Sequence, residues 1–391
     1  MRVVAFGTTN TGEGYPRMDV LLDGLSRHDV HVERVLHPLF SGHAEKMKLA
    51  SGGIASALNL MPRAFSTYSR LGRAYRRIPE PDVVLVGGLG HLDLLWLRCL
   101  SGGEHMPVVF DPFLSLYDTV VADRNLAGAG SIRARACLSL ERQACLKADC
   151  ILVDTDTMGL RLARTLDLPP GCIKRIYQGQ DDRIFFPLEG VHPGSQPHAP
   201  VEVFFFGTYV PLQGVETILE AAASLSAETV RFTLVGDGQR AGEAMELARK
   251  LDLTNVEFER QWHTSSALAA RMHRADICLG IFGTSDKAAS VIPLKAVAAL
   301  AMGRPLITQD SPAARELLVH GKNAWLVPPG DGEALAAAIR TLAASREFRE
   351  EIGVQGRRLY LERMSPTALG RELKHVLESL VEERMRKVAT V

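Results

Sequence analysis

Short runs of strand-forming residues alternate with longer helical patterns along almost the whole chain. Three of these runs, at residues 83–86, 108–110 and 151–153, are apolar throughout. A strand with one solvated face alternates polar and apolar residues, whereas a strand buried on both faces is apolar all along. The pattern therefore predicts parallel sheets covered by helices, which is an α/β fold.

The alternating pattern occurs twice, and an irregular stretch separates the two parts. Residues 190–200 read GVHPGSQPHAP, with three prolines, two glycines and no periodicity, so we predict a linker there. We expect an N-terminal domain over 1–189, a C-terminal domain over 201–364, and a helical segment over 365–391 that packs back toward the N-terminal domain. The remaining predicted strands are 3–6 and 32–36 before the linker, and 203–206, 232–235, 256–258, 277–281, 306–308 and 325–327 after it.

Length and composition agree with two such domains and exclude several classes of protein. The 391 residues are enough for two domains with their own cores, and we expect doubly wound, Rossmann-like domains that face each other across a ligand-binding cleft. Lys plus Arg and Asp plus Glu both number 45, so no overall charge favours nucleic acid. The six cysteines include no Cys-x-x-Cys pair, which argues against a zinc site or a disulfide framework. With no apparent signal peptide or membrane-spanning run, we expect a cytoplasmic protein.

An anion-binding site is predicted in the C-terminal half, within the segment GIFGTSDKAASVIPLKAVAALAMGRPLI. Pro293 is suited to the first turn of a helix, and Lys295 lies in that turn. The helix dipole opposes a cation at this position, so a lysine there makes sense if a diphosphate binds to the free amides. The alternative, that Lys295 points to water, stays open from the sequence alone.

Two further loops of this half follow predicted strands and contain glycine. The first strand ends at Gly207, and a helix begins near Gly214; the second ends in LVGDGQ, with Gly236 and Gly238 at the turn. Such loops and helix starts can hold phosphate, although a tight turn explains the second Gly-x-Gly equally well. Trp262, after a third strand, is a candidate to stack on a nucleobase, and a packed surface tryptophan is the alternative.

These motifs, in this order, resemble glycosyltransferase family 4. The resemblance covers nearly the whole chain and includes the N-terminal glycine loop, DDRIFFP, FGTYVPLQG, LVGDGQ, ALAMGRPLI and KNAWLVPPGDGEALAAAI. It implies the GT-B fold and a retaining transfer of a sugar from a nucleoside-diphosphate donor to an acceptor hydroxyl, without metal or cofactor. It also implies that the donor binds mainly to the C-terminal half.

The chain departs from the family pattern at four positions of the donor site. Thr208 and Gln213 stand where the family usually has Arg and Lys on the diphosphate, and Ser290 and Ala298 stand where it usually has a Glu-x7-Glu pair. A subset of the family has Pro-x-Lys at the helix start, which Pro293, Leu294 and Lys295 match, so Lys295 with Lys287 is expected to replace the missing cations. The expected donor-binding residues are Gly207, Thr208, Gln213, Gly214, Gly236, Gly238, Trp262, Lys287, Ser290, Pro293, Leu294 and Lys295.

The acceptor is expected at the N-terminal domain, where polar residues follow two apolar strands. Asp111 and His91 are the predicted catalytic residues: Asp111 would orient the acceptor or stabilise positive charge on the sugar, and His91 would bond a sugar hydroxyl. The alternatives are an N-cap-type contact for Asp111 and a structural helix-start residue for His91. The expected acceptor-binding residues are Gly12, Arg17, Asp93, Tyr117 and Asp118, with a surface arginine bonded to a carbonyl or carboxylate as the alternative for Arg17.

Two other features carry weaker hypotheses. Asp154 and Asp156 flank a threonine at a predicted helix start, and helix capping explains them without a metal. The segment 46–77 carries seven Lys or Arg interleaved with apolar residues, which suits peripheral contact with an anionic membrane that holds a lipid-linked acceptor. A helix pair with one packed face is the alternative.

Three classes of function stay open from the sequence. The first is an active hexosyl-type glycosyltransferase in polysaccharide, glycolipid or glycoside biosynthesis. The second is a GT-B protein that has lost catalysis and acts as a partner or binding module, for which the four departures argue. The third is a sugar-nucleotide epimerase, which the lack of paired acids and bases disfavours. The donor sugar, its base and the acceptor are not specified.

Overall fold

The computed structural model describes residues 1–9, 12, 16–39, 54–101, 106–112, 115–117, 128, 130–169, 171–188 and 200–389. The chain forms two compact units. The N-terminal unit comprises Met1–Val153, Gly159–Ile176 and Leu369–Val391, and the C-terminal unit comprises Asp154–Met158 and Tyr177–Ala368. Residues 190–199 of the predicted linker lie outside the described residues.

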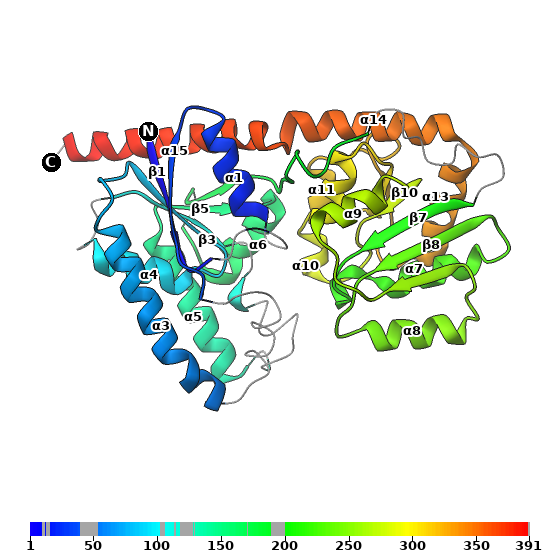
Figure 1. Ribbon diagram of the computed structural model, residues 1–391, viewed down its shortest axis with the longest axis horizontal. Coiled ribbons are helices and arrows are strands. Elements are labelled where there is room, and N and C mark those ends of the chain that lie inside the picture. The colour runs from blue at the N-terminus through cyan, green and yellow to red at the C-terminus, as the bar shows by residue number, and fades with distance from the viewer. Residues whose placement is uncertain are drawn as a thin grey trace. The chain divides into compact units, whose positions relative to one another are not determined.

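The N-terminal unit contains a six-stranded parallel sheet in the order β2-β1-β3-β4-β5-β6, flanked by helices (Figure 1). Its strands are β1 (Arg2–Gly7), β2 (His31–Leu36), β3 (Val83–Gly87), β4 (Val108–Asp111), β5 (Cys150–Val153) and β6 (Ile173–Arg175). The helices are α1 (Pro16–Ser26), α3 (Ile54–Tyr75), α4 (His91–Leu100), α5 (Ile132–Lys147) and α6 (Asp156–Leu166). The five predicted strands are present, and β3, β4 and β5 are buried throughout, as their apolar sequences predict.

The C-terminal unit repeats this architecture with the order β12-β11-β10-β7-β8-β9. Its strands are β7 (Val201–Phe206), β8 (Val230–Val235), β9 (Val256–Glu259), β10 (Ile277–Leu279), β11 (Leu306–Gln309) and β12 (Trp325–Val327). Its helices are η2 (Pro211–Gln213), α7 (Val215–Ser224), α8 (Ala241–Lys250), α9 (Ser265–Met272), α10 (Asp286–Ala289), α11 (Leu294–Ala301), α12 (Pro312–Arg315), α13 (Gly332–Ala344) and α14 (Arg346–Arg363).

Each sheet has one point where the strand order reverses. β1 has β2 on one side and β3 on the other, and β7 likewise lies between β8 and β10. In an open α/β sheet, ligands bind beyond the carboxyl ends of the strands at this switch point. The loops after β1 and β3, and those after β7 and β10, are therefore the places where each unit is expected to bind a ligand.

Two helices, α14 and α15 (Pro366–Ala389), end the described chain, and α15 corresponds to the helical segment predicted over 365–391. The break falls at Met364 and Ser365, where the Ser365 hydroxyl accepts a hydrogen bond from the Ala368 amide at 3.2 Å and Pro366 begins the new helix. Most of α15 belongs to the N-terminal unit: Lys374 donates to the His28 carbonyl at 2.9 Å. No helix in the described ranges is long and apolar enough to cross a membrane.

Candidate functional site

The loops at the switch point of the C-terminal sheet are packed too closely for side chains at their glycines. A Cβ atom on Gly236, which has φ +141°, would lie 1.9 Å from the Gly207 carbonyl oxygen, and one on Gly238 would lie 2.7 Å from the Tyr209 amide nitrogen. The loop after β7 therefore rests directly on the loop after β8. Of the glycines predicted from the sequence, Gly207, Gly236 and Gly238 lie at this contact.

The loop after β7 also packs against the loop after β10. Gly214 adopts a left-handed conformation with φ 64°, and a Cβ atom there would lie 2.5 Å from the Phe282 carbonyl carbon. The Phe282 amide donates to the Gln213 carbonyl at 3.1 Å. These contacts fix the short helix η2, so that Gln213 is held at the carboxyl ends of β7 and β10.

Lys295 completes this cluster from the second residue of α11, the helix that Pro293 precedes. Its side chain is 5% exposed; its Nζ donates to Gln213 Oε1 and lies 3.6 Å from the centroid of the Phe205 ring. A Cβ atom on Gly207 would be 2.6 Å from the same Nζ. The alternative that Lys295 points to water is therefore wrong.

The electrostatics of Lys295 suit an anion. Among the described residues no carboxylate forms an ion pair with it, and burial lowers the pKa of its ammonium group well below the usual value. The amide oxygen and the aromatic face that hold the Lys295 amine supply no counter-charge, so a nearby anion would favour its protonated form. A bound diphosphate would supply the missing negative charge at the start of α11.

The other predicted donor residues lie in the same unit but make different contacts. Ser290 is buried, its hydroxyl donates to the Asp286 carbonyl at 2.6 Å, and its carbonyl accepts from the Thr155 hydroxyl at 2.6 Å. Thr208 and Lys287 are half-buried, Ala298 is fully buried in α11, and Trp262 is 71% exposed in the loop after β9. The structure thus joins Gly207, Gln213 and Lys295 directly, while Trp262 presents its ring to solvent.

In the N-terminal unit, Asp93 ties the loops after β1 and β3 together. Its carboxylate accepts hydrogen bonds from the Thr8 amide at 2.7 Å, from the Thr8 hydroxyl, and from the Tyr68 hydroxyl at 2.7 Å. A Cβ atom on Gly7 would lie 2.6 Å from Asp93 Oδ2, so the carboxylate fills the space beside the strand end. Burial raises the pKa of Asp93.

Arg17 and Asp111 form a buried ion pair at the same edge of the sheet. Arg17 Nε donates to both Asp111 oxygens at 2.8 and 2.9 Å, its Nη2 lies 2.8 Å from Oδ1, and its Nη1 donates to the Ile176 carbonyl at 3.0 Å. Burial raises the pKa of Asp111, and the Arg17 guanidinium opposes that rise. Arg17 is bonded to a carboxylate and a carbonyl, as its alternative stated, but it is buried and not a surface residue. The sequence did not identify Asp111 as its partner.

His91 begins α4 and is only 2% exposed. Its ring contacts Phe110 edge to face, with centroids 5.1 Å apart, and burial lowers the pKa of the imidazole to about 4. In the described part of the chain, Nε2 has no hydrogen-bond partner. His91 is therefore neutral near pH 7.

Two further predicted acceptor residues, Gly12 and Tyr117, donate backbone hydrogen bonds to carboxylates. The Gly12 amide donates to Asp19 at 2.6 Å, and the Tyr117 amide donates to Glu141 Oε2 at 3.0 Å. Glu141 is fully buried and also accepts from the Ser115 hydroxyl at 3.0 Å. The sequence did not single out Glu141, because a glutamate within a helical pattern resembles a solvated surface residue. Asp118 lies outside the described residues.

The Asp-Thr-Asp string does cap a helix, although through the threonine. The Thr155 hydroxyl accepts from the Met158 amide at 3.0 Å, and Glu316 accepts from the Asp156 amide at 2.9 Å. No group of three or more His, Cys, Asp or Glu side chains in the described ranges could hold a metal ion.

Comparison with known proteins adds the following. Residues 200–345 match the family described as Glycosyl transferases group 1. A Salmonella typhimurium protein named as a colanic acid biosynthesis glycosyltransferase, WcaL, is 26% identical over 239 residues, which are 60% of this chain and 57% of that protein. The MMP alpha-(1->4)-mannosyltransferase of Mycolicibacterium hassiacum is 30% identical over 175 residues, 44% of this chain and 41% of that protein. The chain thus spans about half the length of the curated relatives it matches.

Among solved structures, sucrose-phosphate synthase from Thermosynechococcus elongatus has a TM-score of 0.72 at 17% identity, covering 98% of this chain and 99% of that one. HepE of Anabaena, solved in complex with UDP and glucose, has a TM-score of 0.69 at 17% identity, covering 97% and 100%. With two parallel six-stranded sheets and these neighbours, the chain has the two-domain α/β GT-B fold, and residues 200–345 are similar to glycosyltransferases of group 1.

Proposed function

We propose that the chain is a glycosyltransferase whose nucleoside-diphosphate sugar donor binds to the C-terminal unit at Lys295. The observation that carries this proposal is the buried Lys295, held by Gln213 beside Gly207 and without a carboxylate partner among the described residues. The match of residues 200–345 to glycosyltransferases supports it. Negative charge accumulates on a departing nucleoside diphosphate, and a preorganised cation at this point stabilises it.

Gln213 and Lys295 together are proposed to offset the missing cation at position 213. The resemblance places a lysine there, where this chain has Gln213. Lys295 Nζ bonds Gln213, so its charge comes close to the position that the usual lysine would occupy. We infer that the cation is supplied from α11 instead of from the loop after β7, and that Gln213 orients it.

The acceptor is proposed to bind to the N-terminal unit, and the transfer to retain configuration without a metal. In a retaining reaction the leaving phosphate can take the acceptor proton, so a strong general base is not required. This suits Asp111, whose carboxylate is bound to Arg17, and His91, which is buried and neutral. In this proposal both residues orient the acceptor or stabilise charge on the sugar. The transferred sugar is proposed to be a hexose.

We propose that the acceptor is held at a membrane, and the basis is the exposed side of α3. Phe65 is 79% exposed there and Met61 is 64% exposed, and both lie in the basic segment 46–77, of which residues 46–53 lie outside the described residues. Exposed apolar side chains among arginines suit the interface of an anionic membrane. The proposed location is therefore cytoplasmic and peripheral at the membrane, and nucleic acid is not a proposed partner.

The proposal is tested by donor hydrolysis and nucleotide affinity. The protein is assayed with a panel of UDP-, GDP- and ADP-sugars, and the affinity of the matching nucleoside diphosphate is measured by calorimetry. Lys295→Met is expected to weaken that affinity at least tenfold, because a charge-assisted contact contributes about 1.5–3 kcal/mol. Lys322→Met is the matched control, since Lys322 is an exposed lysine of the same unit.

Two outcomes contradict the proposal in different ways. Unchanged nucleotide affinity in Lys295→Met removes the donor site from α11. Tight nucleotide binding without hydrolysis or transfer of any donor in the panel would mean that the chain has kept a binding site and lost catalysis.

A further inference from the structure

Two helices of the N-terminal unit expose large apolar side chains along the line where they meet. Helices α3 and α4 lie side by side (Figure 1), and the Tyr68 ring of α3 contacts the Trp96 ring of α4 edge to face, with centroids 6.0 Å apart. One turn further along each helix, a Cβ atom on Gly72 would lie 3.3 Å from Leu100 Cδ2. In both contacts the α4 residue comes 28 positions after the α3 residue, so the two helices run in the same direction.

This alignment brings together four exposed residues, which we call the apolar seam: Met61 and Phe65 on α3, and Leu92 and Trp96 on α4. Leu92 is 55% exposed and Trp96 is 37% exposed, and the two α3 residues are more exposed still. Because both helices rise equally per residue, Leu92 lies level with position 64, beside Phe65. The two residues of each helix are four positions apart and share a face. The four side chains therefore form one patch on the surface.

The exposed surface of α3 beyond the seam is basic. Helix α3 contains three arginines and neither aspartate nor glutamate, and two more arginines follow it; all five are exposed: Arg63, Arg70, Arg73, Arg76 and Arg77. The acidic residue of α4, Asp93, is buried and accepts hydrogen bonds from Thr8 and Tyr68. Carboxylates of these two helices therefore do not balance the positive charge beside the seam.

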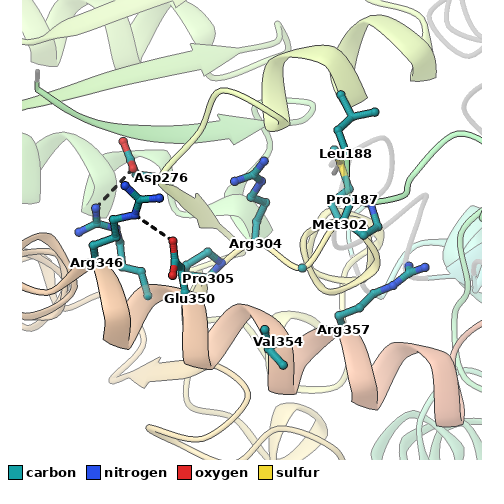
Figure 2. A pocket seen from close by; sticks show the side chains of 12 residues that line it. Pro187, Leu188, Asp276, Met302, Arg304, Pro305, Arg346, Glu350, Val354 and Arg357 are labelled. Carbon is teal, nitrogen blue, oxygen red and sulfur yellow. Dashed lines mark hydrogen bonds and ion pairs between the residues drawn. The ribbon is translucent and has the colours of Figure 1, made fainter. Parts of the chain in front are cut away.

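Exposed apolar residues on another helix lack this charge pattern. Helix α14 of the C-terminal unit exposes Val354 and Leu361, which are 65% and 50% exposed. Two arginines of this helix form ion pairs at 2.9 Å with glutamates one turn later: Arg346 with Glu350 and Arg358 with Glu362. Figure 2 shows the first of these pairs on the same helix as Val354, at the edge of a cavity. Helix α14 thus pairs its charges beside its apolar residues, whereas α3 does not.

We propose that the apolar seam and the arginines of α3 dock the N-terminal unit on an anionic lipid bilayer. The four apolar side chains enter the boundary between head groups and acyl chains, while the arginines stay at the level of the lipid phosphates. A second copy of this chain fits the patch less well than a bilayer does. A twofold contact would place the arginines of one copy against those of the other, where they repel each other.

The seam adjoins the loops where the acceptor is proposed to bind. Leu92 is next to Asp93, whose carboxylate accepts from the Thr8 amide in the loop after β1 and from the Tyr68 hydroxyl, both at 2.7 Å. Docking therefore brings the loops after β1 and β3 to the membrane surface. The acceptor that fits this arrangement is a lipid whose polar head group carries the accepting hydroxyl. This last step rests on the proposed function, whereas docking on a bilayer does not.

The test is sedimentation of the full chain with two kinds of vesicle, one of phosphatidylcholine and one of equal parts phosphatidylcholine and phosphatidylglycerol. We expect stronger binding to the anionic vesicles, and this binding should weaken as salt is added. Lipids with brominated acyl chains should quench tryptophan emission, and Trp96→Phe should remove most of that quenching. Absence of binding, equal binding to both kinds of vesicle, or the same quenching in Trp96→Phe would each overturn the proposal.

Variants locate the binding on the seam. Phe65→Ser and Leu92→Ser should each weaken binding to the anionic vesicles about tenfold, because each removes a large apolar side chain from the bilayer. Leu361→Ser is the matched control on α14 and should bind as the parent protein does. All three positions are exposed, so the variants should stay folded, which urea unfolding checks. Unchanged binding in Phe65→Ser and Leu92→Ser, or an equal loss in Leu361→Ser, would contradict docking through the seam.

Nucleotide affinity separates this proposal from the proposed function. Phe65→Ser and Leu92→Ser should keep the nucleoside-diphosphate affinity of the parent protein, because Lys295 belongs to the other unit. Vesicle binding without nucleotide binding would support the docking surface and contradict the donor site, and nucleotide binding without vesicle binding would do the reverse. A concentration-dependent dimer in gel filtration that Phe65→Ser abolishes would assign the seam to a second copy of the chain and overturn the proposal.

Discussion

At the scale of single residues, the side chains to which we assign a function are buried charges whose partners lie far away in sequence. Lys295 binds Gln213, 82 residues earlier, and Arg17 binds Asp111, 94 residues later. The residue types at the strand ends could be predicted, because the carboxyl ends of parallel strands are where ligands bind. The pairings could not, because they depend on which strand ends become neighbours and on the depth of each side chain.

Lys295 should take up a proton when nucleotide binds. Burial lowers its pKa in the free protein, and a nearby diphosphate should raise it again. At pH 8, above the second pKa of a phosphate of about 6, UDP itself contributes little proton exchange. Calorimetry in two buffers of different ionisation enthalpy should therefore show proton uptake, and affinity should fall as the pH rises. Lys295→Met should abolish the uptake; an unchanged uptake in that variant would assign the proton to another group.

His91 should make the folded state sensitive to mild acid. Its folded pKa of about 4 lies below the unfolded value, so between pH 6.5 and 4 the unfolded chain binds a proton that the folded chain does not. The free energy of unfolding should therefore fall as the pH falls through that window, by about 2 kcal/mol from pH 7 to pH 5. Urea unfolding at both pH values should show a smaller drop for His91→Gln. An identical drop in the variant would mean that other groups cause it.

At the scale of elements, composition determined which parts of the fold the sequence could predict. Buried strands such as β3 and β5 are continuous apolar runs, so their positions followed from the sequence. β6 was missed because its three residues, Ile-Lys-Arg, are partly exposed at the sheet edge and have no such run. The division between α14 and α15 falls beside the predicted boundary between residues 364 and 365, where Ser365 and Pro366 are ordinary signals for a helix start.

The contact between the loops after β7 and β8 should tolerate no side chain. Gly236→Ala would place a methyl group against the Gly207 carbonyl oxygen and would force a residue with a Cβ atom into φ +141°. We therefore expect the free energy of unfolding to fall by at least about 2 kcal/mol and nucleotide binding to weaken. Gly242→Ala is the control. No atom lies within 4 Å of its Cβ position, it lies within α8, and alanine there should stabilise the helix by about 0.5–1 kcal/mol. Denaturant titration and calorimetry measure both quantities, and equal stability of the two variants would argue against the close contact.

At the scale of the whole molecule, the chain returns to complete the unit in which it begins. Leu369, Leu373 and Leu377 of α15 are fully buried in the N-terminal unit, at spacing that places them on one face of the helix. The Arg175–Glu372 ion pair, at 3.2 Å, joins β6 to the same helix. The sequence predicted a returning helix, and the physical reason for its docking is this leucine stripe, which would otherwise face water.

A cavity in that stripe should therefore weaken the N-terminal unit and leave the C-terminal site intact. Leu373→Ala removes a fully buried side chain and should cost about 2–5 kcal/mol of unfolding free energy. Met385→Ala, which shortens a side chain on α15 that is 62% exposed, should change stability by less than about 0.5 kcal/mol. Nucleotide affinity should be equal in both variants and in the parent protein, because Lys295 and Gln213 belong to the other unit. Urea unfolding gives the first comparison and calorimetry the second. A matching loss of nucleotide affinity in Leu373→Ala, under conditions where the variant stays folded, would show that the donor site depends on α15 and that the two units do not function independently.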